Sequence, residues 1–203
     1  MWTYEKRLQF PVKITKPCPK TASLIISQFG GPDGELAASM RYLSQRYTMP
    51  CKEVGGLLTD IGTEELGHLE IICSIIYQLT KNMKIEDAKA AGFDAYYIDH
   101  TAAVWPQAAG GVPFNACEFQ SKGDAITDLH ENLAAEQKAR TTYDNLIRII
   151  PYAEVREPLK FLRAREIVHF QRFGEALEKL KSDLDAKNFY YFNAEFDKQF
   201  VKK

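Results

Sequence analysis

The sequence predicts an all-α protein, a four-helix bundle in which one long crossover joins the second helix to the third. Three observations lead to this prediction. Four stretches place apolar residues at three- and four-residue steps, which is the spacing of one helix face. Short connections join the first two stretches and the last two, whereas residues 81–123 form a connection of about 43 residues. No stretch carries the alternation of apolar and polar residues that is typical of a β-strand.

The first predicted helix is in two pieces. Residues 21–29 (TASLIISQF) form a short apolar helix, and GGPDG at 30–34 interrupts it. The segment ELAASMRYLSQRY then resumes the helical pattern, which ends before Pro50. A long second helix is expected over residues 50–80, where the apolar positions keep helical steps throughout.

The third and fourth helices are marked by their ends. Asp124 is a good cap for the third helix, and Pro151 stops it. The fourth begins near Glu154, takes Pro158 in its early turns and runs to about residue 181. Two short connections and one long crossover are the ferritin-like topology.

We expect the 203 residues to form a single domain, with the bundle over residues 21–181 and the crossover over 81–123. The crossover carries six aromatic side chains, which are costly to leave in water, so it is predicted to be ordered. Residues 182–203 form an aromatic C-terminal tail, which is expected to pack on its own bundle or on a neighbouring subunit.

Composition excludes several classes of function. The chain has 26 Lys and Arg against 27 Asp and Glu, a net charge of −1, so no overall field attracts nucleic acid or an anionic membrane. The N-terminus does not resemble a secretory signal, and no apolar stretch is long enough to span a bilayer. The four cysteines lack the spacing of metal knuckles or of a disulfide framework, so free thiols are expected.

Two ExxH motifs are the candidate chemical groups. Residues three apart lie on one helix face, so Glu65 and His68 can point at one spot, and so can Glu166 and His169. A single ExxH motif is weak evidence, because glutamate is common. Two such motifs among only four histidines are less easily explained by chance.

The two motifs belong to an internal repeat. Glu35 stands 30 residues before the glutamate of the first motif, and Glu136 stands 30 residues before that of the second. A shift of 101 residues maps the first set onto the second, and it also carries Tyr42 onto Tyr143. Each tyrosine follows its glutamate by two turns, where its hydroxyl can bond a carboxylate of the site or simply belong to the core.

Packing the two helix pairs around a pseudo-two-fold axis brings four carboxylates and two imidazoles to a common centre. Buried carboxylates without cations are costly, and four negative charges match two divalent cations. Oxygen-rich ligation with one imidazole per ion suits manganese or iron, whereas structural zinc prefers thiolates. The alternative is that these glutamates are surface charges on amphipathic helices.

Other motifs offer no competing chemistry. His100 and His130 have no glutamate three positions earlier and are expected to be loop or surface imidazoles. The segment GGPDG lacks the Lys and Ser or Thr of a phosphate-binding loop, and the sequence contains neither GxSxG nor HExxH.

With this set of residues, the chain resembles the manganese catalase family of the ferritin-like superfamily, over roughly residues 20–181. Within that family, GGPDGELAASMRYLSQRY, IGTEELGHLEI and LRAREIVHFQRFGEAL resemble the spore-coat type. The resemblance implies a dimanganese site that disproportionates hydrogen peroxide to oxygen and water.

The resemblance also implies a role for each residue. Glu166 matches a family glutamate beside the metal cluster that serves as an acid and base, and Glu65 is expected to bridge both ions. Tyr42 matches a tyrosine that hydrogen-bonds the metal-ligating glutamate equivalent to Glu35. The residues that match metal ligands are Glu35, Glu65, His68, Glu136 and His169.

One position departs from the family pattern. Some members place an arginine directly before the glutamate that matches Glu136, and this chain has Ala135 there. Arg140 and Arg165 are the candidates for a compensating charge.

Three functions follow as hypotheses. The first is a dimanganese catalase with hydrogen peroxide as its substrate. The second is a diiron oxidase, peroxidase or iron-handling protein on the same scaffold, because both metals accept these ligands. The third is a structural coat protein without turnover. The resemblance further implies a homo-oligomer that meets other coat proteins in the spore coat, assembled from the cytoplasm of the sporulating cell, without nucleic-acid or membrane partners.

Overall fold

The computed structural model describes residues 3–5 and 7–185. These described residues contain no β-strand, and their one β-bridge pairs Gln107 with Pro113. No helix among the described residues is long and apolar enough to cross a membrane. The helical elements are α1 (Pro19–Ile25), α2 (Ser27–Gly30), α3 (Glu35–Gln45), η1 (Arg46–Thr48), α4 (Lys52–Thr80), α5 (Ile85–Ala91), α6 (Asp94–His100), η2 (Ala116–Glu118), α7 (Ala125–Ile149) and α8 (Ala153–Asp185).

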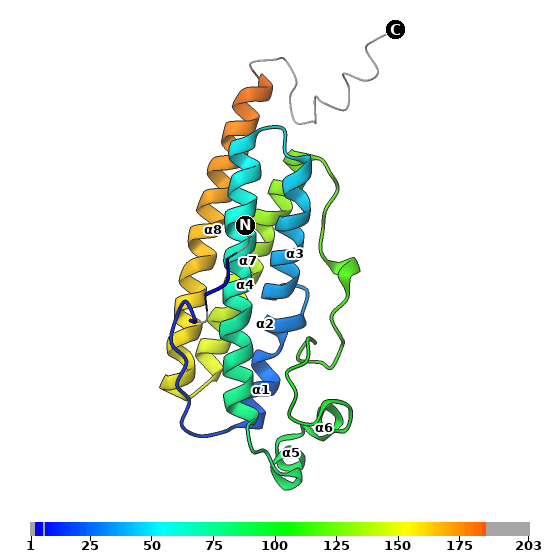
Figure 1. Ribbon diagram of the computed structural model, residues 1–203, viewed down its shortest axis with the longest axis vertical. Helices are drawn as coiled ribbons and strands as arrows, with labels where there is room; N and C mark the ends of the chain where they lie inside the picture. The colour runs from blue at the N-terminus through cyan, green and yellow to red at the C-terminus, as the bar shows by residue number, and fades with distance from the viewer. Residues whose placement is uncertain (1–2, 6, 186–203) are drawn as a thin grey trace.

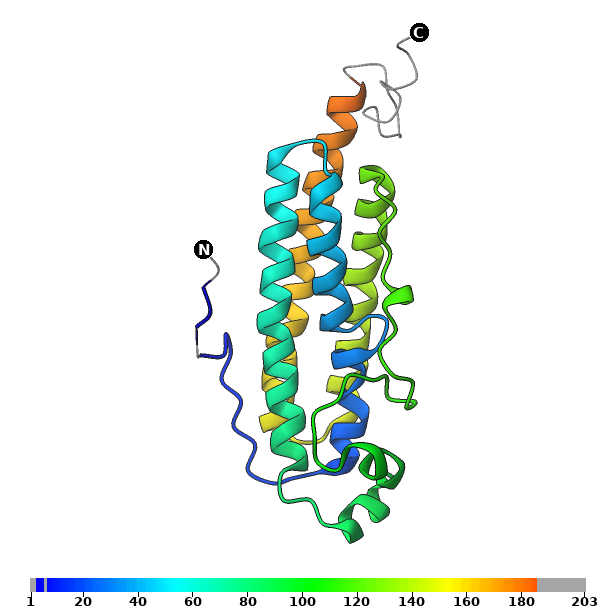
Figure 2. The same cartoon turned by 45° about the vertical axis from the view of Figure 1, so that its right-hand side comes forward.

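The long helices form an antiparallel bundle (Figures 1 and 2). The broken segment α1–α3 packs beside α4, and α7 packs beside α8. Helices α4 and α7 run in the same direction, because the crossover between them climbs the length of the bundle before α7 begins (Figure 1). The all-α, ferritin-like topology predicted from the sequence is thereby confirmed.

The helix ends follow the predicted signals, with one extension. The side chain of Asp124 accepts a hydrogen bond of 2.8 Å from the amide of Thr127 and so caps α7. Helix α8 tolerates Pro158 and continues to Asp185, so residues 182–185, predicted as the start of the tail, belong to its last turn. The predicted packing of the aromatic tail concerns residues 186–203, which lie outside the described part of the chain.

The break in the first helix places Glu35 at the start of α3. Gly34 precedes α3 with an extended backbone, and a Cβ at this position would lie 2.7 Å from the carbonyl oxygen of Ser27. Only glycine therefore allows the chain to turn so tightly between α2 and α3. As a result, Glu35 occupies the first turn of a helix, where the helix dipole favours a carboxylate.

Helices α3 and α4 pack closely at Gly62. A Cβ on Gly62 would lie 2.9 Å from Cγ of Leu43, and the hydroxyl of Ser39 donates a hydrogen bond of 2.8 Å to the Gly62 carbonyl. This close approach holds Glu35 of α3 beside Glu65 of α4.

The core consists of two apolar clusters with a polar layer between them. One cluster contains Ile71, Ile75 and residues of α1, α7 and α8, and the other contains Leu58, Phe173 and residues of α3 and α7. The buried glutamates and histidines of the two ExxH motifs lie between these clusters. Apolar packing on both sides therefore shields the polar layer from solvent.

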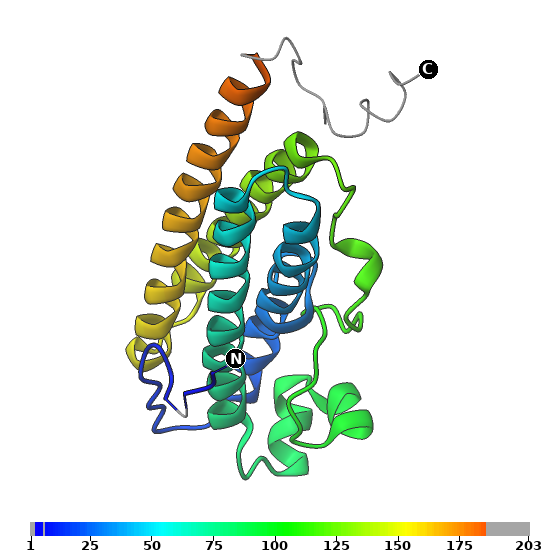
Figure 3. The same cartoon turned by 45° about the horizontal axis from the view of Figure 1, so that its top comes forward.

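The crossover contains two short helices, α5 and α6, that the sequence pattern did not indicate (Figure 3). The rings of Phe93 and Tyr96 stack with centroids 4.4 Å apart, and both side chains are buried. Trp105, by contrast, is 42% exposed, so the aromatic residues of the crossover are only partly covered. An N-terminal arm runs beside α4 (Figure 2), where Gln78 donates to the Val12 carbonyl.

Candidate metal centre

Six predicted site residues meet in the polar layer. Helix α3 contributes Glu35, α4 contributes Glu65 and His68, α7 contributes Glu136, and α8 contributes Glu166 and His169. All six are buried, with exposed fractions of 3% or less. One ligand atom from each of Glu65, His68, Glu166 and His169 lies within 4.8 Å of the others. These buried positions rule out the alternative that the glutamates are surface charges.

The centre has two matching halves that share Glu65. In the first half, Nδ1 of His68 lies 2.7 Å from Oε2 of Glu65 and 3.8 Å from Oε2 of Glu35. In the second half, Nδ1 of His169 lies 2.8 Å from Oε1 of Glu65 and 3.6 Å from Oε2 of Glu136. Each oxygen of Glu65 thus faces one histidine, and the same nitrogen of that histidine approaches one further glutamate. The internal repeat of the sequence appears here as two equivalent half-sites.

Each of the two tyrosines donates a hydrogen bond to a glutamate on the other helix of the α3–α7 pair. The hydroxyl of Tyr42 on α3 donates to Oε1 of Glu136 on α7, and the hydroxyl of Tyr143 on α7 donates to Oε1 of Glu35 on α3. The implied bond from Tyr42 to Glu35 is therefore wrong. Seven residues of helix span about 10.5 Å, too far for a tyrosine to reach back to its own glutamate. Because α3 and α7 are antiparallel neighbours, each tyrosine instead lies level with the other glutamate.

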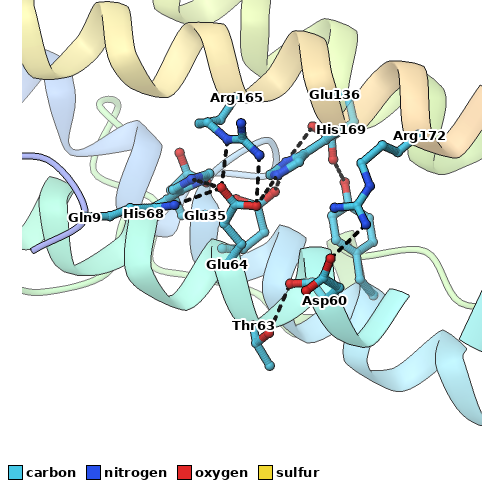
Figure 4. Close-up of polar contacts among 12 residues, drawn as sticks. Gln9, Glu35, Asp60, Thr63, Glu64, His68, Glu136, Arg165, His169 and Arg172 are labelled. Carbon is cyan, nitrogen blue, oxygen red and sulfur yellow. Dashed lines mark hydrogen bonds and ion pairs between the residues drawn. The ribbon is translucent and has the colours of Figure 1, made fainter. Parts of the chain in front are cut away.

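Glu64 contacts the centre, although the motif analysis did not identify it. Its Oε2 lies 3.1 Å from Nε2 of His169, and its Oε1 lies 3.5 Å from Nε2 of His68 (Figure 4). Arg165 donates to both oxygens, at 2.7 and 3.2 Å, and Gln9 of the N-terminal arm donates at 2.9 Å. One carboxylate therefore hydrogen-bonds the His169 ring and lies within ion-pair distance of the His68 ring, on the side opposite Glu65. Nε2 of His68 has no hydrogen-bond partner among the described residues. The position of Glu64 four residues before His68, on the same helix face, was the available signal.

Burial and mutual repulsion change the protonation of the centre. Burial and the charges of Glu35 and Glu136 hold the pKa of Glu166 well above its ordinary value. Burial and the charge of Glu65 raise the pKa of Glu35 to about 8. Burial alone would lower the pKa of His169, but its glutamate neighbours raise it to about 12. Without cations, the centre therefore holds protons that cations would displace.

The polar atoms of the centre fit bound cations. Nδ1 of His169 and Oε1 of Glu65 are 2.8 Å apart, yet neither atom has a hydrogen-bond partner among the described residues. Oε2 of Glu136 and Oε1 of Glu166 are also buried without a partner in that part of the chain. Buried atoms of this kind are costly unless they hold a ligand. Carboxylates with one imidazole in each half suit manganese or iron.

Comparison with known proteins identifies the family. The model of the family of manganese-containing catalases matches residues 1–203. This chain belongs to the manganese catalase family. The resemblance predicted from the sequence is confirmed.

Relatives cover nearly the whole chain. Protein CotJC of Bacillus subtilis (strain 168) is 52% identical over 190 residues, which are 94% of this chain and 100% of CotJC. A probable manganese catalase of Clostridium acetobutylicum is 34% identical over 93% of this chain and 85% of its own. The crystal structure of KatB, a manganese catalase from Anabaena, matches with a TM-score of 0.82 and 32% identity, over 89% of this chain and 81% of KatB.

The remaining predicted residues have other environments. Arg140 pairs with Asp144, with Nη1 2.7 Å from Oδ2. Arg165 pairs with Glu64. Arg140 therefore pairs away from the six site residues, whereas Arg165 acts on the centre from the Glu64 side. Neither histidine outside the motifs joins the centre, since His100 stacks on Trp105 at 4.6 Å and His130 is exposed.

Proposed function

We propose that this manganese catalase family member is a dimanganese catalase that disproportionates hydrogen peroxide to oxygen and water. The observation that carries the proposal is the pair of half-sites that share the Glu65 carboxylate. In the proposal, Glu35, Glu65, His68, Glu136 and His169 would hold two manganese ions, with one histidine and one further glutamate in each half beside the shared Glu65. When bound, the two ions supply the reversible two-electron store that disproportionation requires.

The chain's own residues handle the protons. One peroxide gives oxygen, two protons and two electrons, and a second peroxide takes up two of each to give two waters. Glu166 is buried and its Oε1 has no hydrogen-bond partner among the described residues, so it is placed to accept a proton in the first half and return it in the second.

Elemental analysis of protein purified without added metal, with oxygen evolution measured on the same sample, tests the proposal. About two manganese ions per chain and rapid oxygen release are expected. Two iron ions with little oxygen would favour the diiron oxidase, peroxidase or iron-handling function. Fully metallated protein without peroxide turnover would favour a structural role alone, and absence of bound metal would refute the shared centre.

A location in the spore coat is the second part of the proposal. It rests on the 52% identity to CotJC, which covers the whole of that relative. In this setting the protein is a homo-oligomer in contact with other coat proteins. A fluorescent fusion expressed in a sporulating cell should first appear in the mother-cell cytoplasm and then move to the spore surface. A fusion that stays dispersed through the cytoplasm would contradict the coat location.

A further inference from the structure

A narrow cavity between α3 and α7 leads to the metal centre. Its outer lining includes exposed Pro32 and partly exposed Asp33, and its inner lining includes Glu35 and Glu166. The space open to the centre of a water molecule is about 10 Å³, close to what one water needs. Water therefore fits without movement of the walls, and a ligand with two or three non-hydrogen atoms would pass only with a small movement of the side chains that line the cavity.

Arg41 is the cationic residue of this cavity. Its side chain is only 2% exposed, and its Nε has no hydrogen-bond partner among the described residues. A guanidinium stays charged when buried, and burial without full hydrogen bonding is costly. A buried donor that lines a cavity and lacks a partner points to a ligand with an acceptor atom. Arg41 shares the lining of this cavity with Glu166, the proposed acid and base.

The wall contributed by α7 is made of small residues. Ala135 and Ala139 line the cavity opposite α3, and both are buried. A larger side chain at position 135 would fill the space beside Glu166. The departure from the family pattern at Ala135 therefore leaves the cavity open and leaves Arg41 as the cationic group in its lining.

The opposite side of the centre is closed. A wider groove lies between the N-terminal arm and α4, and it reaches Glu64 without including Glu35 or Glu166 in its lining. Glu64 is hydrogen-bonded there to His169, Arg165 and Gln9, and it lies 3.5 Å from Nε2 of His68. A small molecule in that groove would have to break these contacts to reach the centre.

We propose that the cavity between α3 and α7 is the passage to the centre for a small ligand that has an oxygen or nitrogen acceptor atom. We further propose that Arg41 positions this ligand beside Glu166. The proposal rests on the proposed function, in which the ligand is hydrogen peroxide. The Nε–H group of Arg41 donates to an acceptor atom of the ligand, while the small side chains of α7 leave room for it.

Two substitutions and a matched control test the passage. Ala135→Leu fills the cavity, Arg41→Met removes the donor, and Ala134→Leu adds the same volume at the neighbouring exposed position of α7. We expect both cavity variants to raise KM for peroxide about tenfold or more with a smaller change in kcat, because they weaken access and positioning. Arg41→Lys should restore part of the loss, and Ala134→Leu should behave as the unsubstituted protein.

Binding of azide to the metal-loaded protein provides a readout that does not depend on turnover. Spectroscopic titration should show an azide Kd raised about tenfold or more in Arg41→Met, with metal content unchanged. Unchanged azide affinity and unchanged KM in both cavity variants would overturn the proposal. Loss of metal from Arg41→Met would also overturn it, because Arg41 would then support the centre instead of the ligand. A metal-loaded protein that binds azide through this passage but does not turn over peroxide would contradict the catalase function alone.

Discussion

Oε2 of Glu64 lies 3.1 Å from Nε2 of His169, whereas Nδ1 of the same ring lies 2.8 Å from Oε1 of the shared Glu65. The same side chain approaches Nε2 of His68 at 3.5 Å. A single carboxylate outside the proposed ligand set therefore hydrogen-bonds one imidazole and lies within ion-pair distance of the other, and Arg165 and Gln9 donate hydrogen bonds to that carboxylate.

Glu64→Gln should weaken metal binding about 10- to 100-fold, because a neutral amide orients the two rings less strongly and raises their basicity less. Competition with a chelator of known affinity measures the change. Asp60→Asn is the matched control, since Asp60 lies one turn earlier on α4 and pairs with Arg172 at the surface. Equal metal affinity in the Glu64 and Asp60 variants would show that Glu64 does not orient the rings.

Glu166→Gln should reduce kcat about 100- to 10,000-fold with two metal ions per chain retained, because glutamine cannot carry a proton between the two halves of the reaction. Stopped-flow peroxide assays and metal analysis of the same sample measure the two quantities. Loss of one ion per chain would instead indicate that Glu166 is a metal ligand and that the centre resembles a diiron centre.

Tyr42→Phe and Glu136→Gln should be energetically coupled, because Tyr42 donates to Glu136 and not to Glu35. A double-mutant cycle on the unfolding free energy of the metal-free protein should give a coupling of about 1 kcal/mol. The cycle that combines Tyr42→Phe with Glu35→Gln is the control and should give a smaller coupling. The reverse order of the two couplings would contradict the crossed arrangement.

Metal uptake should release protons and strengthen as pH rises. The pKa of Glu35 is raised to about 8 and that of His169 to about 12 in the metal-free protein, so at pH 7 both groups are protonated. A ligand must be deprotonated, so metal competes with these protons, and the affinity increases as the pH approaches and passes 8. Calorimetry in two buffers of different ionisation enthalpy counts the released protons. An affinity independent of pH between 6 and 9 would show that neither group ligates the metal.

Gly62→Ala should destabilise the fold by about 1–3 kcal/mol, because the added Cβ meets Leu43 where α3 and α4 pack. The control is Gly56→Ala on the same helix, where a Cβ meets nothing within 4 Å. That change should stabilise the protein by about 0.5–1 kcal/mol, since alanine favours helix over glycine. Chemical denaturation of the two variants measures both effects, and equal shifts in the same direction would contradict the packing argument.

The four long helices, their order and the six residues of the centre could be predicted from the sequence. Apolar spacing, a cap at Asp124 and the break at residues 30–34 are local signals, and each acts within a few residues of its position. The repeat of an ExxH motif with a glutamate 30 residues earlier carried the remaining information, because it links helix faces that are far apart in the chain.

The contacts between side chains of different helices could not be predicted from the sequence. The partner of Tyr42, the double contact of Glu64 and the place of Arg41 in the cavity all depend on how neighbouring helices are rotated and aligned. Periodicity shows which face of a helix is buried, but the alignment of antiparallel helices is set by long-range packing such as that of Leu43 against Gly62. Local sequence does not specify that alignment, so the spacing left the carboxylate partner of each tyrosine open, and the bond from Tyr42 to Glu35 that the resemblance implied is wrong. The two short crossover helices were missed because seven residues are too few to show a helical period.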